Sequence, residues 1–266
     1  LRVADRYFNS RNVALVTGAA SGIGKAVVVA LALNGITVAG ADIDEEGGKK
    51  TVEIARGLGG QAAFVRTDLA QDGQIENFVE EASRYGTIRF LANIAGIQHI
   101  DSVEDFPMRT YDLMQRVMLR APFYLSKLCI PHMRRSEDGV GVVGNMCSVH
   151  GHIATKNKPA YNITKFGLRG LTQSIAAEGN GKVRSFTVSV GYVKTPLALD
   201  QIPEQARQRR ITPEEVVRDV MLGRCQVKEM MSPIEVANLF TIAFSNLGKY
   251  LVGGDLLFDG GMVGTY

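Results

Sequence analysis

At residues 17–24 the chain reads Thr17-Gly18-Ala19-Ala20-Ser21-Gly22-Ile23-Gly24. A β-branched run over residues 13–17 leads into this glycine-rich stretch, and an apolar run with helical periodicity over residues 22–33 follows it. Glycines at such a turn let the backbone approach a phosphate group, and the start of the helix offers free N–H groups. The segment therefore predicts the first strand–turn–helix unit of a dinucleotide-binding sheet.

The same alternation of strand and helix continues along the chain. Further strand-like runs lie at residues 36–42, 62–67, 88–93, 141–147, 183–190 and 255–258. Amphipathic helical patterns lie between them at residues 45–58, 72–85, 111–134, 159–178 and 234–246. Strands that alternate with helices indicate βαβ units and a parallel sheet covered on both faces. We expect one α/β domain over residues 1–266, with a doubly wound, Rossmann-type, seven-stranded parallel sheet.

Composition narrows the class of protein further. The 266 residues carry a net charge of +3, too small an excess to predict a nucleic-acid or membrane partner. The longest apolar run covers residues 26–33, far short of the ~20 residues of a membrane span. Three cysteines without a CxxC pair predict neither disulfides nor a metal site, and they favour the reducing cytoplasm. We also expect no secretory signal, because strand-like sequence begins near residue 12.

One segment, residues 196–232, interrupts the alternation. It is long, polar and helix-rich, and it follows the sixth strand-like run. Ligands bind at the carboxyl ends of the strands in open α/β sheets, so we expect this insertion to be a substrate lid. The alternative is a plain surface excursion. Its basic cluster of Arg207, Arg209 and Arg210 is typical of a solvated helix face.

Three polar residues end successive strands on the side where the glycine-rich turn lies. Asp42 ends the second strand-like run, where a carboxylate can accept hydrogen bonds from both ribose hydroxyls and would repel a 2′-phosphate. No Arg or Lys stands at Ser21 or Ile43, so the pattern predicts NAD(H) rather than NADP(H). Asp68 and Asn93 end the next two runs, where cofactor binding and a simple turn or cap role are both open.

A second group of residues suits proton transfer. Tyr161 and Lys165 are spaced i, i+4 on a predicted helix and so share one face, and Ser148 follows the fifth strand-like run. A free phenol has a pKa of ~10, and we expect a nearby ammonium and a positively charged nicotinamide to lower the pKa of Tyr161. Tyr161 can then exchange a proton with a substrate oxygen during hydride transfer, while Ser148 donates a hydrogen bond to that oxygen.

Together these motifs resemble the short-chain dehydrogenase/reductase family. The resemblance spans essentially the whole chain and includes Ala95-Gly96 and the C-terminal Phe258-Asp259-Gly260-Gly261. It implies an oxidoreductase with catalytic Ser148, Tyr161 and Lys165, in which Lys165 also holds the nicotinamide ribose. It also implies a homotetramer packed through the helices at 111–134 and 159–178. The cofactor residues it implies are Gly18, Ser21, Gly22, Ile23, Gly24, Asp42, Asp68, Leu69, Asn93, Ala95, Gly96, Tyr161, Lys165, Val193 and Thr195.

The pocket segments resemble, more narrowly, the branch of this family that oxidises D-3-hydroxybutyrate to acetoacetate. This resemblance lies in residues 96–99, 103–107, 148–151, 157–161 and 195–203. It implies a small carboxylate substrate held by Gln98, His150, Lys158 and Gln201, beside Ser148, Tyr161 and Tyr192. Two other interpretations stay open: a different small hydroxy acid, keto acid or secondary alcohol, and an NAD-binding protein with little catalysis.

Several residues depart from the family pattern. Met118 stands where the family has an asparagine that holds a water between the lysine and solvent, and a thioether replaces that amide poorly. We therefore expect Met118→Asn to raise the turnover rate. Met262 stands where the narrower branch usually has an aromatic residue, and Tyr192 stands where it usually has an indole. We therefore expect the pocket to fit a somewhat different acyl group.

Overall fold

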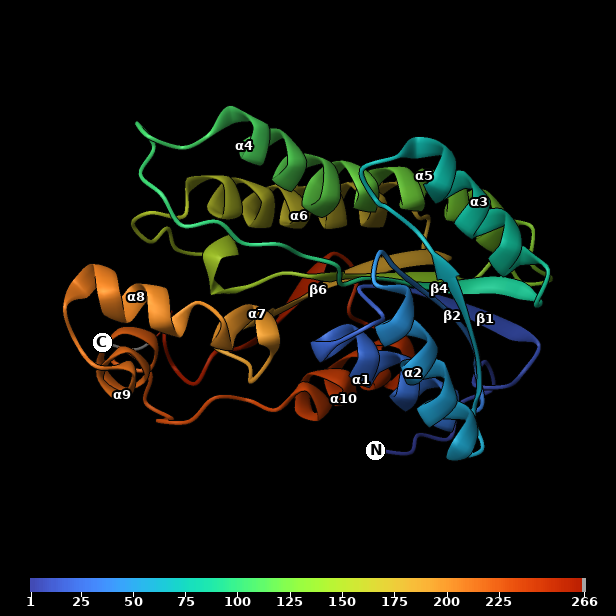
Figure 1. Ribbon diagram of the computed structural model, residues 1–266. Coiled ribbons are helices and arrows are strands. Elements are labelled where there is room, and N and C mark those ends of the chain that lie inside the picture. Colours follow the sequence, from blue (N-terminus) through green and yellow to red (C-terminus); the bar gives the residue numbers. More distant parts are fainter. Residues whose placement is uncertain (265–266) are drawn as a thin grey trace.

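The computed structural model describes residues 1–264 (Figure 1). Within them, a seven-stranded parallel sheet has the order β3-β2-β1-β4-β5-β6-β7. The strands are β1 (Asn12–Thr17), β2 (Thr37–Asp42), β3 (Gln61–Arg66), β4 (Thr87–Asn93), β5 (Gly141–Met146), β6 (Val183–Val190) and β7 (Gly254–Phe258). The chain reverses its direction across the sheet between β1 and β4, which opens a crevice at the carboxyl ends of these strands. The predicted doubly wound fold is confirmed.

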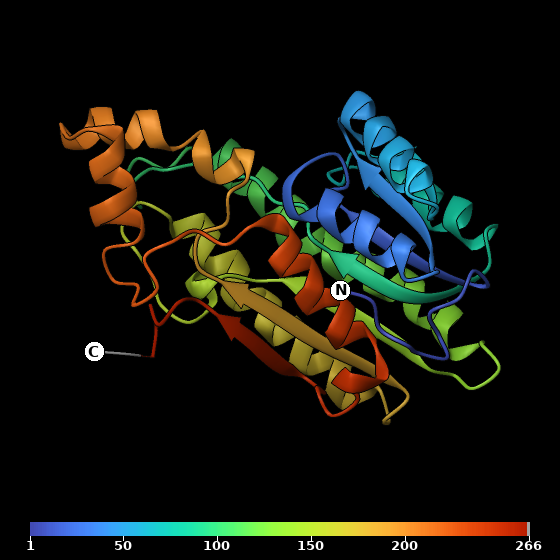
Figure 2. The same ribbon diagram turned by 90° about the horizontal axis from the view of Figure 1, so that it is seen from below.

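Helices cover both faces of the sheet (Figures 1 and 2). One layer contains α1 (Gly22–Leu33), α2 (Glu45–Gly57) and α10 (Pro233–Phe244), and the other contains α3 (Asp72–Ser83), α4 (Met108–Gln115), α5 (Ala121–Arg134) and α6 (Pro159–Glu178). A separate apolar core lies under each layer, one around Phe90 and Phe186 and the other around Phe78 and Leu91. The inner strands β1, β4 and β5 are buried almost along their whole lengths, and most of their side chains are apolar. No helix within residues 1–264 is long and apolar enough to cross a membrane.

The helix predicted over residues 111–134 is not continuous. It begins earlier, as α4, and passes through a π-helical turn, Arg116–Arg120, before α5 begins. Met118 lies in this turn and is buried. A π turn inserts one extra residue, and such turns are frequent at functional sites. The other predicted strands and helices differ from the observed ones by only a few residues at their ends.

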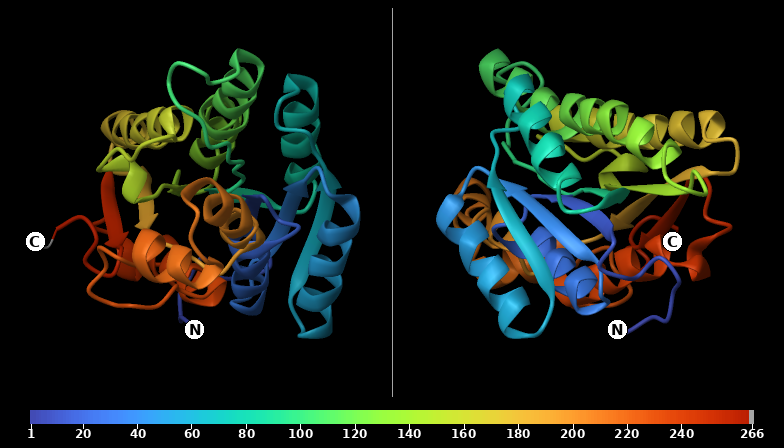
Figure 3. Two further views of the ribbon diagram at one scale, coloured as in Figure 1. Left: turned by 60° about the vertical axis from the view of Figure 1, so that its left-hand side comes forward. Right: turned by 90° about the vertical axis from the view of Figure 1, so that its right-hand side faces the viewer.

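The insertion at 196–232 lies beyond the carboxyl ends of the strands, as predicted (Figures 1 and 3). It contains α7 (Pro196–Leu199), α8 (Ile202–Arg209), α9 (Pro213–Glu215) and a π-helical turn, Val216–Met221. Its own small apolar core packs against Tyr192 and Met262. The three arginines of the basic cluster are exposed, and Arg207 pairs with Glu204 at 2.7 Å. The cluster is therefore a solvated surface, as expected.

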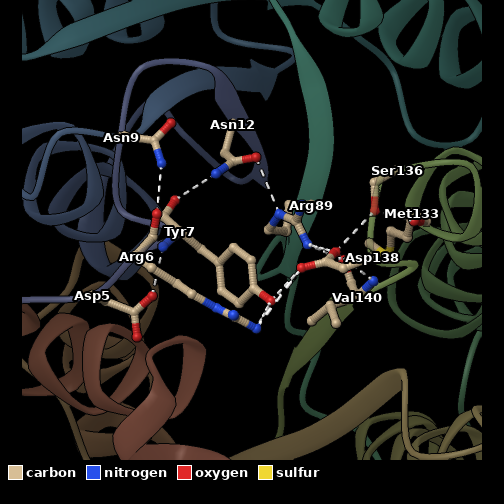
Figure 4. A network of polar contacts seen from close by, with 10 residues as sticks. All are labelled: Asp5, Arg6, Tyr7, Asn9, Asn12, Arg89, Met133, Ser136, Asp138 and Val140. Carbon is tan, nitrogen blue, oxygen red and sulfur yellow. Dashed lines mark hydrogen bonds and ion pairs between the residues drawn. The ribbon is translucent and has the colours of Figure 1, made fainter.

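A polar network at the opposite end of the sheet fastens the N-terminal segment (Figure 4). The buried Arg89 of β4 donates from Nη1 to Asp138 Oδ1 at 2.9 Å, and the Tyr7 hydroxyl donates to the other carboxylate oxygen. The Arg89 guanidinium also lies 4.2 Å from the centre of the Tyr7 ring. Burial opposes ionisation of Asp138, but the hydrogen bonds from Tyr7 and Arg89 hold the pKa of Asp138 well below its usual range. This network stabilises the end of the sheet remote from the crevice.

Candidate active site

The glycine-rich turn is shaped so that backbone N–H groups can reach a ligand. Gly18 and Gly22 have φ angles of +70° and +51°, which suit glycine, and a Cβ on Gly24 would lie 1.9 Å from the carbonyl oxygen of Gly18. Helix α1 begins here without an acidic residue in its first turn, and the side chain of Ser21 makes no capping hydrogen bond in the described structure. The helix start thus keeps free donors and its positive dipole end for an anion.

A cleft of about 350 Å³ lies over this turn. It gathers most of the predicted cofactor residues: Gly18, Ser21, Gly22, Ile23, Gly24, Asp42, Asp68, Leu69, Ala95, Gly96 and Thr195. Asp42 is held in place, because Oδ2 accepts from the Ala20 N–H at 3.0 Å and Oδ1 from the Asp44 N–H at 3.1 Å. The apolar walls come partly from residues without a motif, among them Ile97, Leu113 and Val117, which sequence reasoning missed. These residues fit a dinucleotide: N–H donors for phosphates, a carboxylate for a ribose, and flat apolar walls.

Four predicted cofactor residues lie outside this cleft: Asn93, Val193, Tyr161 and Lys165. Asn93 is buried in the sheet and does not line the cleft; its Nδ2 donates to Asn145 Oδ1 at 2.8 Å. Asn145 in turn donates to Thr172 Oγ1 at 2.8 Å, so these amides tie β4, β5 and α6 together. The structure therefore gives Asn93 a positioning role. Val193 lines the neighbouring pocket instead.

The predicted catalytic residues meet in that neighbouring pocket, of about 120 Å³. It adjoins the cleft, since Ile23, Gly96 and Thr195 line both cavities. Lys165 donates from Nζ to the Met146 carbonyl at 2.8 Å and lies 5.1 Å from the centre of the Tyr161 ring. Ser148 lines the same pocket as Tyr161 and lowers the pKa of its phenol. The three side chains thus lie together at the end of the cleft, where a reacting group would meet a cofactor.

The protonation of Tyr161 differs from the expectation. Burial raises the pKa of Tyr161 above its usual value, and the hydrogen bond from Ser148 only partly offsets this. Burial also lowers the pKa of Lys165 to about 8. The predicted lowering of the phenol pKa is therefore not found in the protein by itself, because desolvation by burial has the largest effect on Tyr161. The phenol keeps its proton, which is the form that donates to a carbonyl oxygen.

The far wall of the pocket carries a buried positive charge. Lys158 is only 8% exposed and forms no ion pair with any residue from 1 to 264. Its Nζ lies 5.8 Å from the centre of the Tyr192 ring, and burial, with a smaller effect of Arg209, lowers the pKa of Lys158 to about 8. A buried ammonium without a counter-ion is unfavourable. An anionic ligand in the pocket would remove that cost.

Two amide side chains flank this charge. Gln98 and Gln201 both line the pocket, as predicted from the sequence. Gln98 Oε1 accepts from the His99 N–H at 3.1 Å, so the NH₂ end of this amide is the end that can donate to a ligand. Gln201 donates to the Leu197 carbonyl, and its buried Oε1 has no partner among residues 1–264. The pocket therefore offers donors together with one unpaired acceptor.

His150 lies in the pocket, but its ring is already engaged. Its Nδ1 is 3.1 Å from Ser148 Oγ, and its Nε2 is 2.9 Å from Thr155 Oγ1. Neither nitrogen is left for a carboxylate, so the predicted role of His150 as a carboxylate donor does not fit its contacts. His152, two residues on, pairs with Asp255 at 2.7 Å. No group of metal-ligating side chains occurs within residues 1–264.

Met118 forms part of an apolar cluster beside the catalytic residues. It packs with Met114 and Ala160, and Tyr161 lies against the same cluster. Met118 is only 1% exposed. Its sulfur lies so near Gly96 that a Cβ at position 96 would be 3.5 Å from it. The position that would hold a polar relay group is thus filled by a side chain that neither donates nor accepts well.

Comparison with known proteins places this geometry in a family. Residues 12–206 match the family model described as short chain dehydrogenase. The chain belongs to the short-chain dehydrogenase family. Members of this family are oxidoreductases, which agrees with a dinucleotide cleft ending at a tyrosine, a lysine and a serine.

Individual relatives differ in what they act on. The chain is 34% identical over 252 residues to a D-beta-hydroxybutyrate dehydrogenase of Rhizobium meliloti, covering 93% of this chain and 97% of that protein. It is 32% identical to a 3-oxoacyl-(acyl-carrier-protein) reductase of Thermotoga maritima, covering 94% and 97%. A crystal structure of an actinorhodin polyketide ketoreductase with NADPH superposes with a TM-score of 0.90 at 25% identity, covering 95% and 97%. This short-chain dehydrogenase therefore has a cleft of the kind that holds a nicotinamide dinucleotide in a relative.

Proposed function

We propose that this short-chain dehydrogenase interconverts D-3-hydroxybutyrate and acetoacetate with NAD(H). The observation that carries the proposal is the buried Lys158, which has no anionic partner within residues 1–264 and shares a pocket with Tyr161. A small carboxylate would pair with this ammonium, and charge-assisted hydrogen bonds are the strong ones. The similarity to a D-beta-hydroxybutyrate dehydrogenase supports the same substrate.

Each pocket residue then has a task. When bound, the nicotinamide supplies the centre that accepts or donates the hydride, and its positive charge favours the Tyr161 phenolate. Tyr161 exchanges a proton with the substrate oxygen, and Ser148 donates a hydrogen bond to that oxygen. Lys165 orients the nicotinamide ribose. Lys158, with Gln98 and Gln201, fixes the carboxylate so that the carbon bearing the oxygen faces Tyr161.

The preference for NAD(H) rests on Asp42. Its carboxylate lines the cleft and is fixed by the backbone N–H groups of Ala20 and Asp44, so it stays where the adenosine ribose would lie. A carboxylate accepts hydrogen bonds from ribose hydroxyls and repels a phosphate in their place. Ser21 and Ile43, which also line this part of the cleft, carry no positive charge.

We also propose a cytoplasmic homotetramer. Phe123 of α5 and Phe166 of α6 are 57% and 46% exposed, although both are large and apolar. Burying such side chains against a second copy stabilises association. Light scattering should give four chains per particle, and Phe123→Glu should reduce that number.

The three cysteines are buried and free, which suits a reducing compartment such as the cytoplasm.

The test of the reaction is to follow NADH formation with D- and L-3-hydroxybutyrate, and NADH consumption with acetoacetate. Turnover of the D form with NAD⁺, and much less with NADP⁺, is the expected result. Turnover of neutral secondary alcohols but of no acid would contradict the proposal.

A second candidate substrate is another small hydroxy acid with an additional donor group. The unpaired, buried Oε1 of Gln201 favours it, because an unmatched buried acceptor is costly and a hydroxyl or amine on the substrate would satisfy it. Adding 3,4-dihydroxybutyrate and 4-amino-3-hydroxybutyrate to the same assay separates the two: a higher kcat/KM for either would favour the second candidate.

A further inference from the structure

A chain of hydrogen-bonding side chains leads from the catalytic phenol to the surface. Ser148 lies in the same pocket as the Tyr161 phenol, whose pKa it lowers, and Ser148 Oγ lies 3.1 Å from His150 Nδ1. On the other side of the ring, His150 Nε2 lies 2.9 Å from Thr155 Oγ1. Ser148 and His150 are buried, whereas Thr155 is an exposed residue of the loop before α6. Every member of the chain can both accept and donate a proton.

On the other side of the site, the Met118 side chain offers no such group. Lys165 is 3% exposed, and its Nζ donates to the Met146 carbonyl. Met118 belongs to an apolar cluster with Met114 and Ala160, against which Tyr161 packs. Methyl, methylene and thioether groups do not carry protons. A proton on Tyr161 therefore cannot leave through the Met118 side chain.

We propose that Ser148, His150 and Thr155 form the path by which protons pass between Tyr161 and solvent. The proposal rests on the proposed reaction, in that Tyr161 must exchange a proton with the substrate oxygen. It gives His150 a role different from the carboxylate contact predicted from the sequence. It also gives a role to Thr155, which carries no sequence motif.

During alcohol oxidation, one proton enters the path from the substrate and one leaves it to solvent. The substrate O–H bond breaks as an O–H bond forms on the Tyr161 phenolate. The Tyr161 proton then passes to Ser148 Oγ, and the proton of Ser148 passes to His150 Nδ1. The proton on His150 Nε2 passes to Thr155 Oγ1, whose own proton goes to water. One proton has entered from the substrate and one has left to solvent, while the two electrons leave with the hydride.

The surroundings of His150 suit this role. Burial, together with the charges of Lys158, just before α6, and Lys165 of α6, lowers the pKa of His150 to about 3. The ring is therefore neutral, with one protonated and one accepting nitrogen, and it passes a proton without holding a second one. This path of side chains returns to its starting protonation state when the His150 ring rotates by half a turn. It also does so when a proton passes inward along it during carbonyl reduction.

Thr155→Val is the decisive substitution. It removes the hydroxyl but keeps the β-branched shape at an exposed site, and the Thr155 carbonyl can still accept from Asn162 Nδ2, at 3.1 Å in the wild type. The loop should therefore stay in place. Thr155→Ser restores the hydroxyl, and Ala154→Val is a matched control that places the same side chain at the neighbouring exposed position.

The measurements are kcat, KM, NADH affinity and the solvent deuterium isotope effect on kcat. We expect Thr155→Val to lower kcat by about tenfold and to raise the isotope effect, because general acid–base steps contribute at least that much. The KM and the NADH affinity should not change, and Thr155→Ser and Ala154→Val should behave as wild type. A wild-type kcat and isotope effect in Thr155→Val would overturn the proposal, as would an equal loss in Ala154→Val.

The substrate used is whichever of the acids and alcohols gives the highest turnover, so that a wrong substrate assignment does not affect the result.

A second readout is independent of turnover. In protein labelled with ¹⁵N-histidine, Thr155→Val should shift the ring nitrogen signals of His150, and Thr155→Ser should leave them near their wild-type positions. Ring signals of His150 that Thr155→Val does not move would overturn the proposal even for a protein that turns over no substrate.

Discussion

Replacing Lys158 by methionine tests the carboxylate pocket, because methionine keeps most of the apolar stem and removes only the charge. The ammonium is 8% exposed and unpaired within residues 1–264, and the pocket places it beside Tyr192 and the two glutamines. If it binds the substrate carboxylate, Lys158→Met removes one charge-assisted bond of about 1.5–3 kcal/mol. That loss corresponds to a rise in KM of about 10- to 100-fold for acids.

The same substitution has a second, opposite effect on the fold. The pKa of Lys158 is lowered from 10.5 to about 8, and one pKa unit corresponds to about 1.4 kcal/mol, so keeping the buried ammonium charged costs about 3 kcal/mol at neutral pH. The unfolded chain binds more protons than the folded one between pH 8 and 10.5. Wild-type stability should therefore rise with pH across this window. Lys158→Met should be more stable than wild type below pH 8, and the difference should shrink above it.

Steady-state kinetics with the acid and with a neutral secondary alcohol, together with urea unfolding at pH 7 and pH 10, measure both effects. The expected pattern is weaker use of the acid, unchanged use of the neutral alcohol, and a higher free energy of unfolding at pH 7. An unchanged KM for the acid would refute the carboxylate role. Lower stability at pH 7 would refute the view that Lys158 is an unpaired buried charge.

Three further predictions concern other parts of the molecule. Asp42→Asn keeps an oxygen to accept the Ala20 or Asp44 N–H but removes the charge. In fluorescence titrations, NADH affinity should fall by about tenfold and NADPH affinity should rise. An unchanged ratio of the NADH and NADPH affinities would contradict the role of Asp42. Asp138→Asn should lower the free energy of unfolding at pH 7 by about 1–3 kcal/mol. Because the folded pKa of Asp138 is depressed, this difference should shrink progressively in urea titrations as the pH falls from about 4 toward the folded pKa, and a difference independent of pH would count against it. Met118→Asn should raise kcat because it offers a second route for protons, and the rise should be larger in the Thr155→Val variant than in wild type. An unchanged kcat in both backgrounds, with the fold intact, would argue that Met118 does not block proton transfer.

Much of the fold could be predicted from local patterns. The glycine-rich turn, Asp42 and the β-branched runs are local signals, and the sheet that they predict is the one observed. The helix over 111–134 shows where local patterns stop. Its apolar periodicity runs through Met118, but the chain forms a π-helical turn at Arg116–Arg120, where Met118 lies beside Gly96 and Ala160, two neighbours that no spacing along the chain predicts.

The site shows the same division. Residues tied to a motif, such as Tyr161, Lys165 and Lys158, lie in the pocket where the sequence places them. Thr155 carries no motif, and its contact with His150 arises from the path of a loop. The pKa of Tyr161 could not be predicted, because an i, i+4 spacing shows that a charge is near, whereas the depth of burial, which dominates here, cannot be inferred from the sequence.

The most direct measurement compares kcat/KM for D-3-hydroxybutyrate with that for its methyl ester, using NAD⁺ and the wild-type protein. The two molecules share the reacting alcohol and differ in charge at the end assigned to Lys158. We predict a kcat/KM for the acid about 10- to 100-fold higher than for the ester, the factor that one charge-assisted contact supplies. Equal values, or a preference for the ester, would contradict the account.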